Sequence, residues 1–181
     1  MDSHAGVVAS PSSWPQRGRA EAAEAVAALF QEHHLDLVRM AVVMLGDVGA
    51  AEDVVQDAFE KLQVRWHRLR DPGSALGYAR ATVLNGCRTA LRRSILARKH
   101  AARAGGTLAA GTDAAQAIAE GSELMAALRG LPRRQREVLV LRFYLDLDVA
   151  EAAAILNINP STVRATTTRA LARLAQMIKE G

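Results

Sequence analysis

Residues 148–171 read DVAEAAAILNINPSTVRATTTRAL, and this stretch decides the fold of the second half of the chain. Asp148 is a good helix N-cap, and Glu151, in the third position after it, can complete a reciprocal capping box. The turn 157–159 (Asn-Ile-Asn) follows, and Pro160 then fits the first position of a new helix, where a missing N–H costs nothing. The pattern predicts two helices joined by a tight turn, which is a helix-turn-helix.

The second helix of this pair has a polar face that can read DNA. The residues expected on that face are Ser161, Thr162, Arg164, Ala165, Thr168 and Arg169. Arginine can bind a guanine edge through two hydrogen bonds, and threonine can contact a phosphate or a thymine methyl group. The alternative is a helical hairpin with a solvated face. The threonine run 166–168 argues against it, because β-branched hydroxyl residues are poor choices for a merely solvated helix. We therefore predict a helix that lies in the major groove.

The composition places this motif in a helical protein. Of 181 residues, 50% are hydrophobic and only 4% aromatic, so a core can form and few segments alternate as strands do. A net charge of +4 is weak support for an acidic partner. Cys87 is the only cysteine, which excludes an intramolecular disulfide and argues against a cysteine-based zinc site. The sequence has no apolar run of transmembrane length and no secretion signal, so we expect a soluble, cytoplasmic protein without membrane insertion.

Helical periodicity divides the chain into two small domains, and the expected fold class is all-α. Residues 1–21, which contain several Ser and Pro, predict a disordered leader, and residues 22–100 predict a domain of three helices. Residues 101–121 lose the periodicity and gain Gly and Ala, which predicts a flexible linker, and residues 122–181 form the second domain. On the second helix the apolar stripe is Val55, Phe59, Leu62 and Trp66, and on the long third helix it is Leu76, Ala79, Val83, Cys87, Leu91 and Ile95.

Two helices of the first domain have opposite charge. Between Asp47 and Glu60 every charged residue is acidic, whereas the many bases between Arg70 and Arg103 are opposed by Asp71 alone. A solvated surface would intersperse the two signs. The face opposite the apolar stripe of the acidic helix carries Asp53, Gln56, Asp57 and Glu60, and its lack of cations favours a basic protein partner.

The basic third helix predicts contact with a nucleic acid. Arg88 and Arg92 lie one turn apart with Arg93 beside them, and Tyr78 and Asn85 lie upstream. The arginines can bind phosphates, while an aromatic ring and an amide can stack on and read an unpaired base. Either Tyr78 or Asn85 alone could be an ordinary core or surface residue, but their joint presence on a basic helix favours binding.

These features together resemble the sigma-70 family of bacterial RNA polymerase sigma factors. Residues 46–66 (GDVGAAEDVVQDAFEKLQVRW) resemble region 2, and residues 128–174, which contain the helix-turn-helix, resemble region 4. The resemblance covers about residues 26 to 178. Two domains joined directly by a linker are typical of the extracytoplasmic-function (group IV) subfamily.

The resemblance implies a division of labour. The coiled coil of the β′ subunit of core polymerase would be bound by the face of Asp53, Gln56, Asp57 and Glu60, and the β subunit is also an expected partner. Melted −10 DNA would be bound by Arg70, Ser74, Tyr78, Asn85, Arg88, Arg92 and Arg93. The −35 duplex would be bound by Ser161, Thr162, Arg164, Ala165, Thr168 and Arg169. The protein would then direct polymerase to promoters and promote melting, and an anti-sigma protein could be a further partner.

Two other function classes explain less of the sequence. A free-standing helix-turn-helix regulator with a dimerising first domain explains the second domain but not the opposed helices of the first. An enzyme is not supported, because the histidines have no metal-ligand spacing and there is no phosphate-binding Gly-rich loop. Cys87 falls on an apolar stripe and is expected to be a core residue. We expect no catalytic residue, metal or cofactor.

Overall fold

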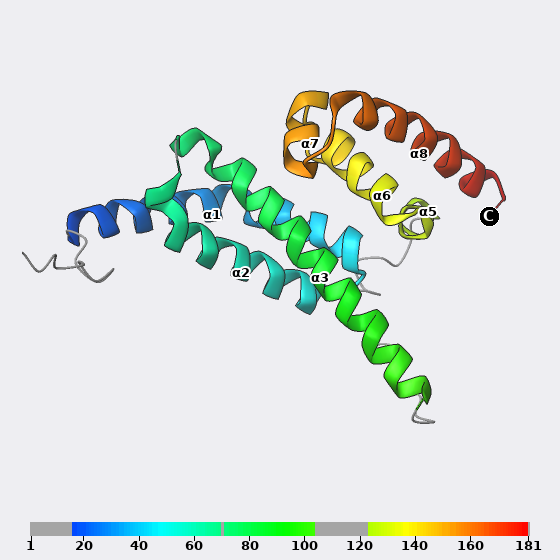
Figure 1. The fold of residues 1–181 in the computed structure, drawn as a ribbon, viewed down its shortest axis with the longest axis horizontal. Coiled ribbons are helices and arrows are strands. Elements are labelled where there is room, and N and C mark those ends of the chain that lie inside the picture. The colour runs from blue at the N-terminus through cyan, green and yellow to red at the C-terminus, as the bar shows by residue number, and fades with distance from the viewer. Residues whose placement is uncertain (1–15, 70, 104–122, 181) are drawn as a thin grey trace, which may run out of the picture.

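The computed structural model describes residues 16–69, 71–103 and 123–180, and every regular element in these ranges is helical, which confirms the all-α class (Figure 1). The first domain comprises α1 (Gln16–Leu45), α2 (Val48–Arg65), the 3₁₀ turns η1 (Trp66–Arg68) and η2 (Pro72–Ser74), and α3 (Ala75–Arg103). The second comprises α5 (Glu123–Gly130), α6 (Arg133–Leu139), the π-helical turn η3 (Val140–Tyr144), α7 (Val149–Leu156) and α8 (Pro160–Glu180).

The first helix begins earlier than its apolar pattern predicts. Helix α1 starts at Gln16, so the expectation of a disordered leader through residue 21 is wrong for residues 16–21, while residues 1–15 lie outside the described chain. Residues 16–21 (QRGRAE) contain good helix formers directly after a proline, which suits the start of a helix. The helix ends as expected at Gly46, whose φ of +76° is a conformation that glycine adopts without steric cost.

Helix α2 follows its predicted pattern closely. The side chain of Asp47 caps the helix by accepting a hydrogen bond of 2.7 Å from the amide of Ala50. Val55, Phe59 and Leu62 are buried against the neighbouring helices. This packing fixes which face of α2 is left for solvent, and that face is the acidic one.

Helix α3 is longer than predicted and is only partly covered. Ala79, Val83 and Cys87 are buried as expected, but Ile95 is 46% exposed, so its placement in the core is wrong. The C-terminal part of α3 projects beyond α1 and α2 (Figure 1), so side chains there have fewer neighbours to cover them. The helix also runs through Arg103, past the expected boundary at residue 100, because residues 101–103 are Ala-Ala-Arg, which favour helix. The rest of the expected linker, residues 104–121, lies outside the described chain.

The helix-turn-helix forms as the sequence predicts. The amide of Glu151 donates to Asp148 Oδ1 at 2.8 Å, and the amide of Asp148 donates to Glu151 Oε2 at 2.7 Å, which completes the capping box. Asn157 adopts the left-handed conformation with φ +52°, Ile158 packs against the core, and α8 begins at Pro160.

Three apolar side chains of the second domain lie closer to solvent than predicted. Leu171 and Ile178 of α8 are exposed, although their spacing predicts an inward face. Phe143 is 59% exposed, although the segment around it predicts a helix buried on most sides. The chain forms a π-helical turn there, and this turn places Phe143 at the rim of an apolar groove.

The two domains pack against each other, which the sequence analysis does not anticipate. Helix α3 packs on α7, and α1 packs on α5, α6 and η3. One continuous apolar core contains Met40, Met44 and Val83 from the first domain together with Val138 and Leu141 from the second. The described chain is therefore in a closed form.

Two glycines of α3 provide a matched test of helix packing. A Cβ at position 86 would lie 2.6 Å from Val54 Cγ1, whereas one at position 77 would meet nothing within 4 Å. We expect Gly86→Ala to force α2 and α3 apart and to destabilise the protein by about 1–3 kcal/mol. Gly77→Ala should stabilise it by roughly 0.5 kcal/mol through helix propensity. Urea unfolding followed by circular dichroism measures the free energy of unfolding of both variants. Equal effects of the two substitutions would contradict the close approach of α3 to Val54 at position 86.

Candidate nucleic-acid and polymerase interfaces

The outer face of α8 is free for a DNA duplex. Val163 and Ala170 are buried and thereby fix the orientation of the helix. All of the side chains predicted to read DNA are exposed as a result: Ser161, Thr162, Arg164, Ala165, Thr168 and Arg169. The helix thus presents polar groups at its N-terminal end, which is the end that contacts bases in a helix-turn-helix.

The threonine run of α8 is less uniform than the sequence argument assumed. Thr166 is buried in the domain, and Thr167 is half-buried with its hydroxyl donating to the carbonyl of Val163 at 2.8 Å. Only Thr168 of the three is exposed. The run therefore supports helix packing as much as DNA contact, and Thr168 alone belongs to the candidate reading face.

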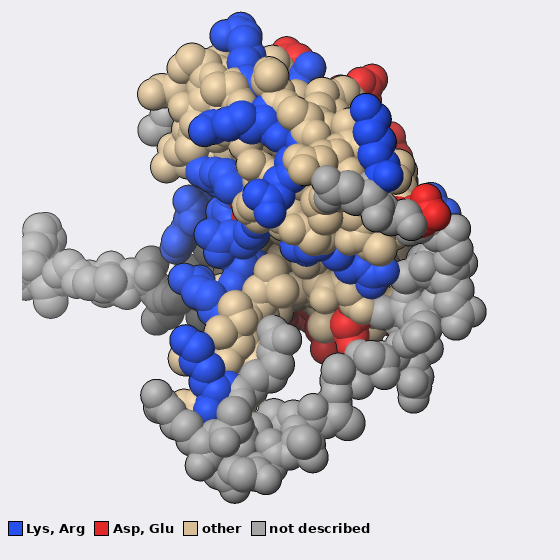
Figure 2. Space-filling view, turned by 90° about the vertical axis from the view of Figure 1, so that its right-hand side faces the viewer, with Lys and Arg blue, Asp and Glu red and all other residues tan. Residues whose placement is uncertain are grey.

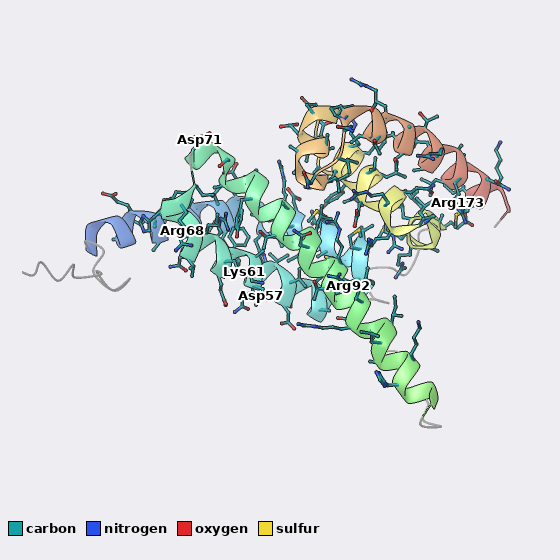
Figure 3. The ribbon with its side chains drawn as sticks, viewed as in Figure 1. Asp57, Lys61, Arg68, Asp71, Arg92 and Arg173 are labelled. Atoms are coloured by element: carbon teal, nitrogen blue, oxygen red, sulfur yellow. The ribbon has the colours of Figure 1, made fainter. Side chains whose placement is uncertain are left out.

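One face of α3 carries most of the residues predicted to bind melted DNA. Tyr78, Asn85 and Arg92 follow one another at seven-residue spacing, which places them on a single face, and Ser74 precedes them by one turn. Asp71 lies just before the N-terminal end of α3, and Arg92 lies further along the helix, beyond its middle (Figure 3). The predicted residue Arg70 lies outside the described residues.

An arginine that sequence reasoning missed joins this face. The guanidinium of Arg65, near the end of α2, lies 5.4 Å from the ring centroid of Tyr78. This distance is within the range of a cation–π contact. Tyr78 is only half-buried, so part of its ring is open to solvent. The sequence does contain a sign of this residue, because Arg65 is a basic residue at the end of the acidic helix.

Arg88 points to the second domain. Its Nε donates to Oε1 of Glu137 at 2.7 Å, and its Nη2 donates to Oε2 at 2.8 Å, so the guanidinium holds the carboxylate with two bonds. Arg88 Nη1 also donates to Oδ1 of Asn85 at 2.8 Å. Two of the residues predicted to bind DNA are thus engaged within the closed protein.

Glu137 is the electrostatic centre of this contact. Its side chain is 0% exposed, and Arg134 and Arg133 of its own helix lie 3.1 and 3.5 Å away. Burial alone would raise the pKa of the Glu137 carboxyl, but the hydrogen bonds and charges of Arg88 and then Arg134 bring it below its ordinary value. Glu137 is therefore ionised at neutral pH. No local pattern identifies it, because Arg88 is 49 residues away in sequence.

The acidic face of α2 is exposed as predicted, but it is not free of cations. Asp53, Gln56, Asp57 and Glu60 are all exposed. Lys61, which directly follows the acidic window, pairs with Asp57 at 3.3 Å, and Figure 3 places both on the same edge of α2. The amide of Gln56 donates to Glu60 Oε1 at 3.1 Å.

Arg93 belongs to this acidic side. It lines a hollow of about 420 Å³ together with Asp53, Gln56 and Asp57, whereas the spacing above puts Asn85 and Arg92 on another face of α3. Its expected grouping with the DNA-binding arginines is therefore not seen in this form.

The basic side chains gather on one side of the molecule. In Figure 2, Lys and Arg form a band that runs from the second domain down to the projecting part of α3, with few acidic side chains interrupting it. Such a band attracts a polyanion. It covers more of the surface than the polar face of α3 or of α8 does by itself. It spans both domains of the closed chain.

The described residues hold no candidate metal site, and their one cysteine is buried. No group of three or more His, Cys, Asp or Glu side chains among them could hold a metal ion. Cys87 is buried, and burial raises the pKa of its thiol to about 12, so the thiolate is scarce at neutral pH. Within the same part of the chain, no helix is both long and apolar enough to span a bilayer.

Known proteins match this chain over both domains. Residues 29–94 match Sigma-70 region 2, and residues 122–174 match Sigma-70 region 4. The RNA polymerase sigma-E factor of Streptomyces coelicolor is 34% identical over 142 residues, which are 77% of this chain and 78% of that protein. The sigma-E factor of Streptomyces avermitilis is 33% identical over 145 residues, 79% of each chain. The chain belongs to the sigma-70 family.

It is a sigma factor of the extracytoplasmic-function type, which directs RNA polymerase to promoters. The family consists of transcription initiation factors rather than enzymes, and a match over both domains does not favour a free-standing regulator. Two solved structures share the fold. CnrH in complex with the cytosolic domain of CnrY matches with a TM-score of 0.65 and 24% identity, over 90% of this chain and 97% of that one. The sigma factor RpoE in complex with the anti-sigma factor NepR from Bartonella quintana matches with a TM-score of 0.62 and 20% identity, over 91% and 98%.

Proposed function

We propose that this sigma factor binds core polymerase with α2, reads the −35 duplex with α8 and captures melted −10 DNA with α3. The observation that carries the proposal is the presence of separate polar faces on α3 and α8, one in each domain, with the acidic face of α2 exposed beside them. Each face suits a different partner, so one chain can connect polymerase to two DNA sites. Polymerase binding and promoter recognition take place in the cytoplasm, where the chromosome lies.

The −35 step uses the exposed end of α8. The outer face of this helix enters the major groove, where Arg164 and Arg169 bind base edges or phosphates and Thr168 contacts a methyl group or a phosphate. Ala165 leaves room for the edge of a base pair close to the helix. Val163 and Ala170 anchor the opposite side of α8 in the domain.

The −10 step uses the face of α3. A base released from the duplex stacks on Tyr78, and the amide of Asn85 reads its edge. Arg88 and Arg92 neutralise the phosphates of the same strand. Ser74 lies at the N-terminal end of this face, where the predicted base pocket of residues 70–74 would be.

The contact with polymerase uses the α2 face. Asp53, Gln56, Asp57 and Glu60 present carboxylates and an amide to a basic surface of the β′ subunit, and the second domain contacts the β subunit. Charge complementarity of this kind speeds association and selects the partner.

An anti-sigma protein is a further proposed partner. The two solved neighbours are complexes, one with the anti-sigma factor NepR and one with the cytosolic domain of CnrY. An apolar groove of about 530 Å³ between the domains, lined by Val42, Leu128, Phe143 and Leu171 among others, offers a surface for such a protein.

Run-off transcription with purified core polymerase and a library of genomic promoters tests the proposal. Transcripts that require both the core enzyme and this chain support it. Gel shifts with promoter duplex provide the second readout. Tight binding by the chain alone, unchanged by core, would instead support a free-standing regulator.

Asn85→Ala tests base capture. We expect run-off transcription to fall about tenfold or more, because one base-specific contact contributes about 1–3 kcal/mol. Core affinity, measured by fluorescence anisotropy with labelled chain, should not change. A matching drop in core affinity would show that Asn85 does not act on DNA.

Asp53→Asn tests the polymerase contact, with Glu24→Gln as its control. Both side chains are exposed, but Glu24 is on α1, so only Asp53 is on the proposed face. We expect Asp53→Asn to weaken core binding by about two- to fivefold, as for a rim ion pair of up to about 1 kcal/mol. The control should bind as the wild type does. Equal losses would argue for non-specific attraction.

Arg164→Ala tests −35 reading, with Arg173→Ala as its control. Arg173 is also exposed on α8 but lies more than two turns further along, towards the free end of the helix (Figure 3). The Arg164 variant should lose about 1–3 kcal/mol of holoenzyme binding to −35 duplex and should discriminate less between promoters. The Arg173 variant should change binding little. If both variants lost the same amount of binding free energy, whatever the promoter sequence, Arg164 would not read bases.

A further inference from the structure

We infer that the Arg88–Glu137 ion pair is an autoinhibitory latch, which holds the two domains closed and withholds from promoter DNA the edge of the Arg88 guanidinium that binds the carboxylate. The inference rests on the proposed role of α3 in binding melted DNA. The two bonds from Arg88 to the carboxylate, at 2.7 and 2.8 Å, occupy its Nε and Nη2. Its Nη1 is occupied by Asn85 Oδ1 at 2.8 Å, so the amide oxygen of Asn85 is engaged as well.

The latch competes directly with DNA. A guanidinium binds a carboxylate and a phosphate with the same two-bond geometry, and it cannot bind both with the same pair of N–H groups. A DNA phosphate that binds this Nε and Nη2 edge of Arg88 therefore has to displace Glu137. The acid acts as an internal stand-in for the phosphate in the closed chain.

The second domain does not need Arg88 in order to keep Glu137 paired. Arg134 and Arg133 lie on the same helix at 3.1 and 3.5 Å from the carboxylate, and their side chains are 41% and 50% exposed. When the first domain leaves, these two arginines and water still satisfy the carboxylate. Opening therefore exchanges partners and leaves no buried unpaired charge, which is what a reversible device requires.

Other polar groups at the same interface are incompletely satisfied. Arg136 donates to the carbonyl of Met44 at 2.9 Å and so caps the end of α1, but its Nε is buried without a hydrogen-bond partner. Arg80 of α3 likewise has a buried Nε with no such partner, and burial lowers the pKa of its guanidinium.

The spacing of the promoter elements gives an independent reason for opening. Centres at −35 and −10 are about 25 base pairs apart, which is about 85 Å of duplex at about 3.4 Å per pair. A compact chain of this length has a radius of gyration of only about 16 Å. With α3 packed on α7, the two reading faces cannot reach both elements at once. The closed form is thus a state that cannot bind a promoter fully.

Energy transfer between two dyes measures the latch in the full chain. Dyes are placed on Gln63→Cys of α2 and Ala175→Cys of α8, both exposed positions, while Cys87 is buried and stays unlabelled. Glu137→Gln and Arg88→Gln should each lower the transfer efficiency, and the double variant should lower it no further than the single ones. The matched control is Arg133→Gln, which removes a partner of Glu137 from within its own domain and should leave transfer unchanged.

Binding of a fluorescein-labelled single-stranded −10 oligonucleotide to unlabelled chain is the second readout. Glu137→Gln should bind about tenfold more tightly than wild type, since the fraction of open chain sets the apparent affinity. Transfer that stays at the wild-type value in both variants would overturn the latch. Opening without tighter DNA binding would overturn its inhibitory role.

Two safeguards keep these outcomes separate. If Glu137→Gln fails to fold, as judged by circular dichroism, then Arg88→Gln still reports on domain closure, because that readout needs no DNA. Run-off transcription by the wild-type chain tests the proposed function independently. Failure there, with the transfer changes as expected, would reject the function and leave the domain contact standing.

Discussion

A carboxylate with no exposed surface must be paired, and in this sigma factor that requirement falls on Glu137. Its two-bond partner comes from the other domain, and two arginines of its own helix complete the surroundings. Apolar side chains of both domains, such as Met44 and Leu141, belong to one continuous core in the closed form. The Arg88–Glu137 pair and this core together hold α3 against the second domain, and the pair engages one of the arginines of α3.

The two DNA-facing helices differ in this respect. The reading face of α8 is exposed in the closed chain, whereas α3 has Asn85 and Arg88 tied together and to Glu137. The acidic face of α2 is also exposed. On the proposed roles of these faces, a closed sigma factor would meet polymerase and duplex DNA first and present α3 to the melted strand afterwards. This order would limit unproductive binding of single-stranded nucleic acid away from a promoter.

Interactions between residues that are close in sequence were predictable, whereas interactions between residues far apart in sequence were not. The capping box of Asp148 and Glu151, the turn at Asn157 and the outward face of α8 each depend on residues within one or two helical turns. The Arg88–Glu137 pair joins positions far apart in sequence, so no window contains it. Ile95 was misplaced because periodicity gives the direction of a side chain but not whether a neighbour is there to cover it. Lys61 was missed because it lies one residue past the acidic window. The roles of the site residues remain predictions.

The most direct test of this account is the distance between the two domains of the wild-type chain before and after core polymerase and promoter DNA are added. Double electron–electron resonance between spin labels on α2 and α8 measures that distance in frozen solution. A single short distance in the free chain and a clearly longer one in the promoter complex is the predicted result. A short distance that persists in the promoter complex would contradict both the latch and the division of the two promoter elements between the domains.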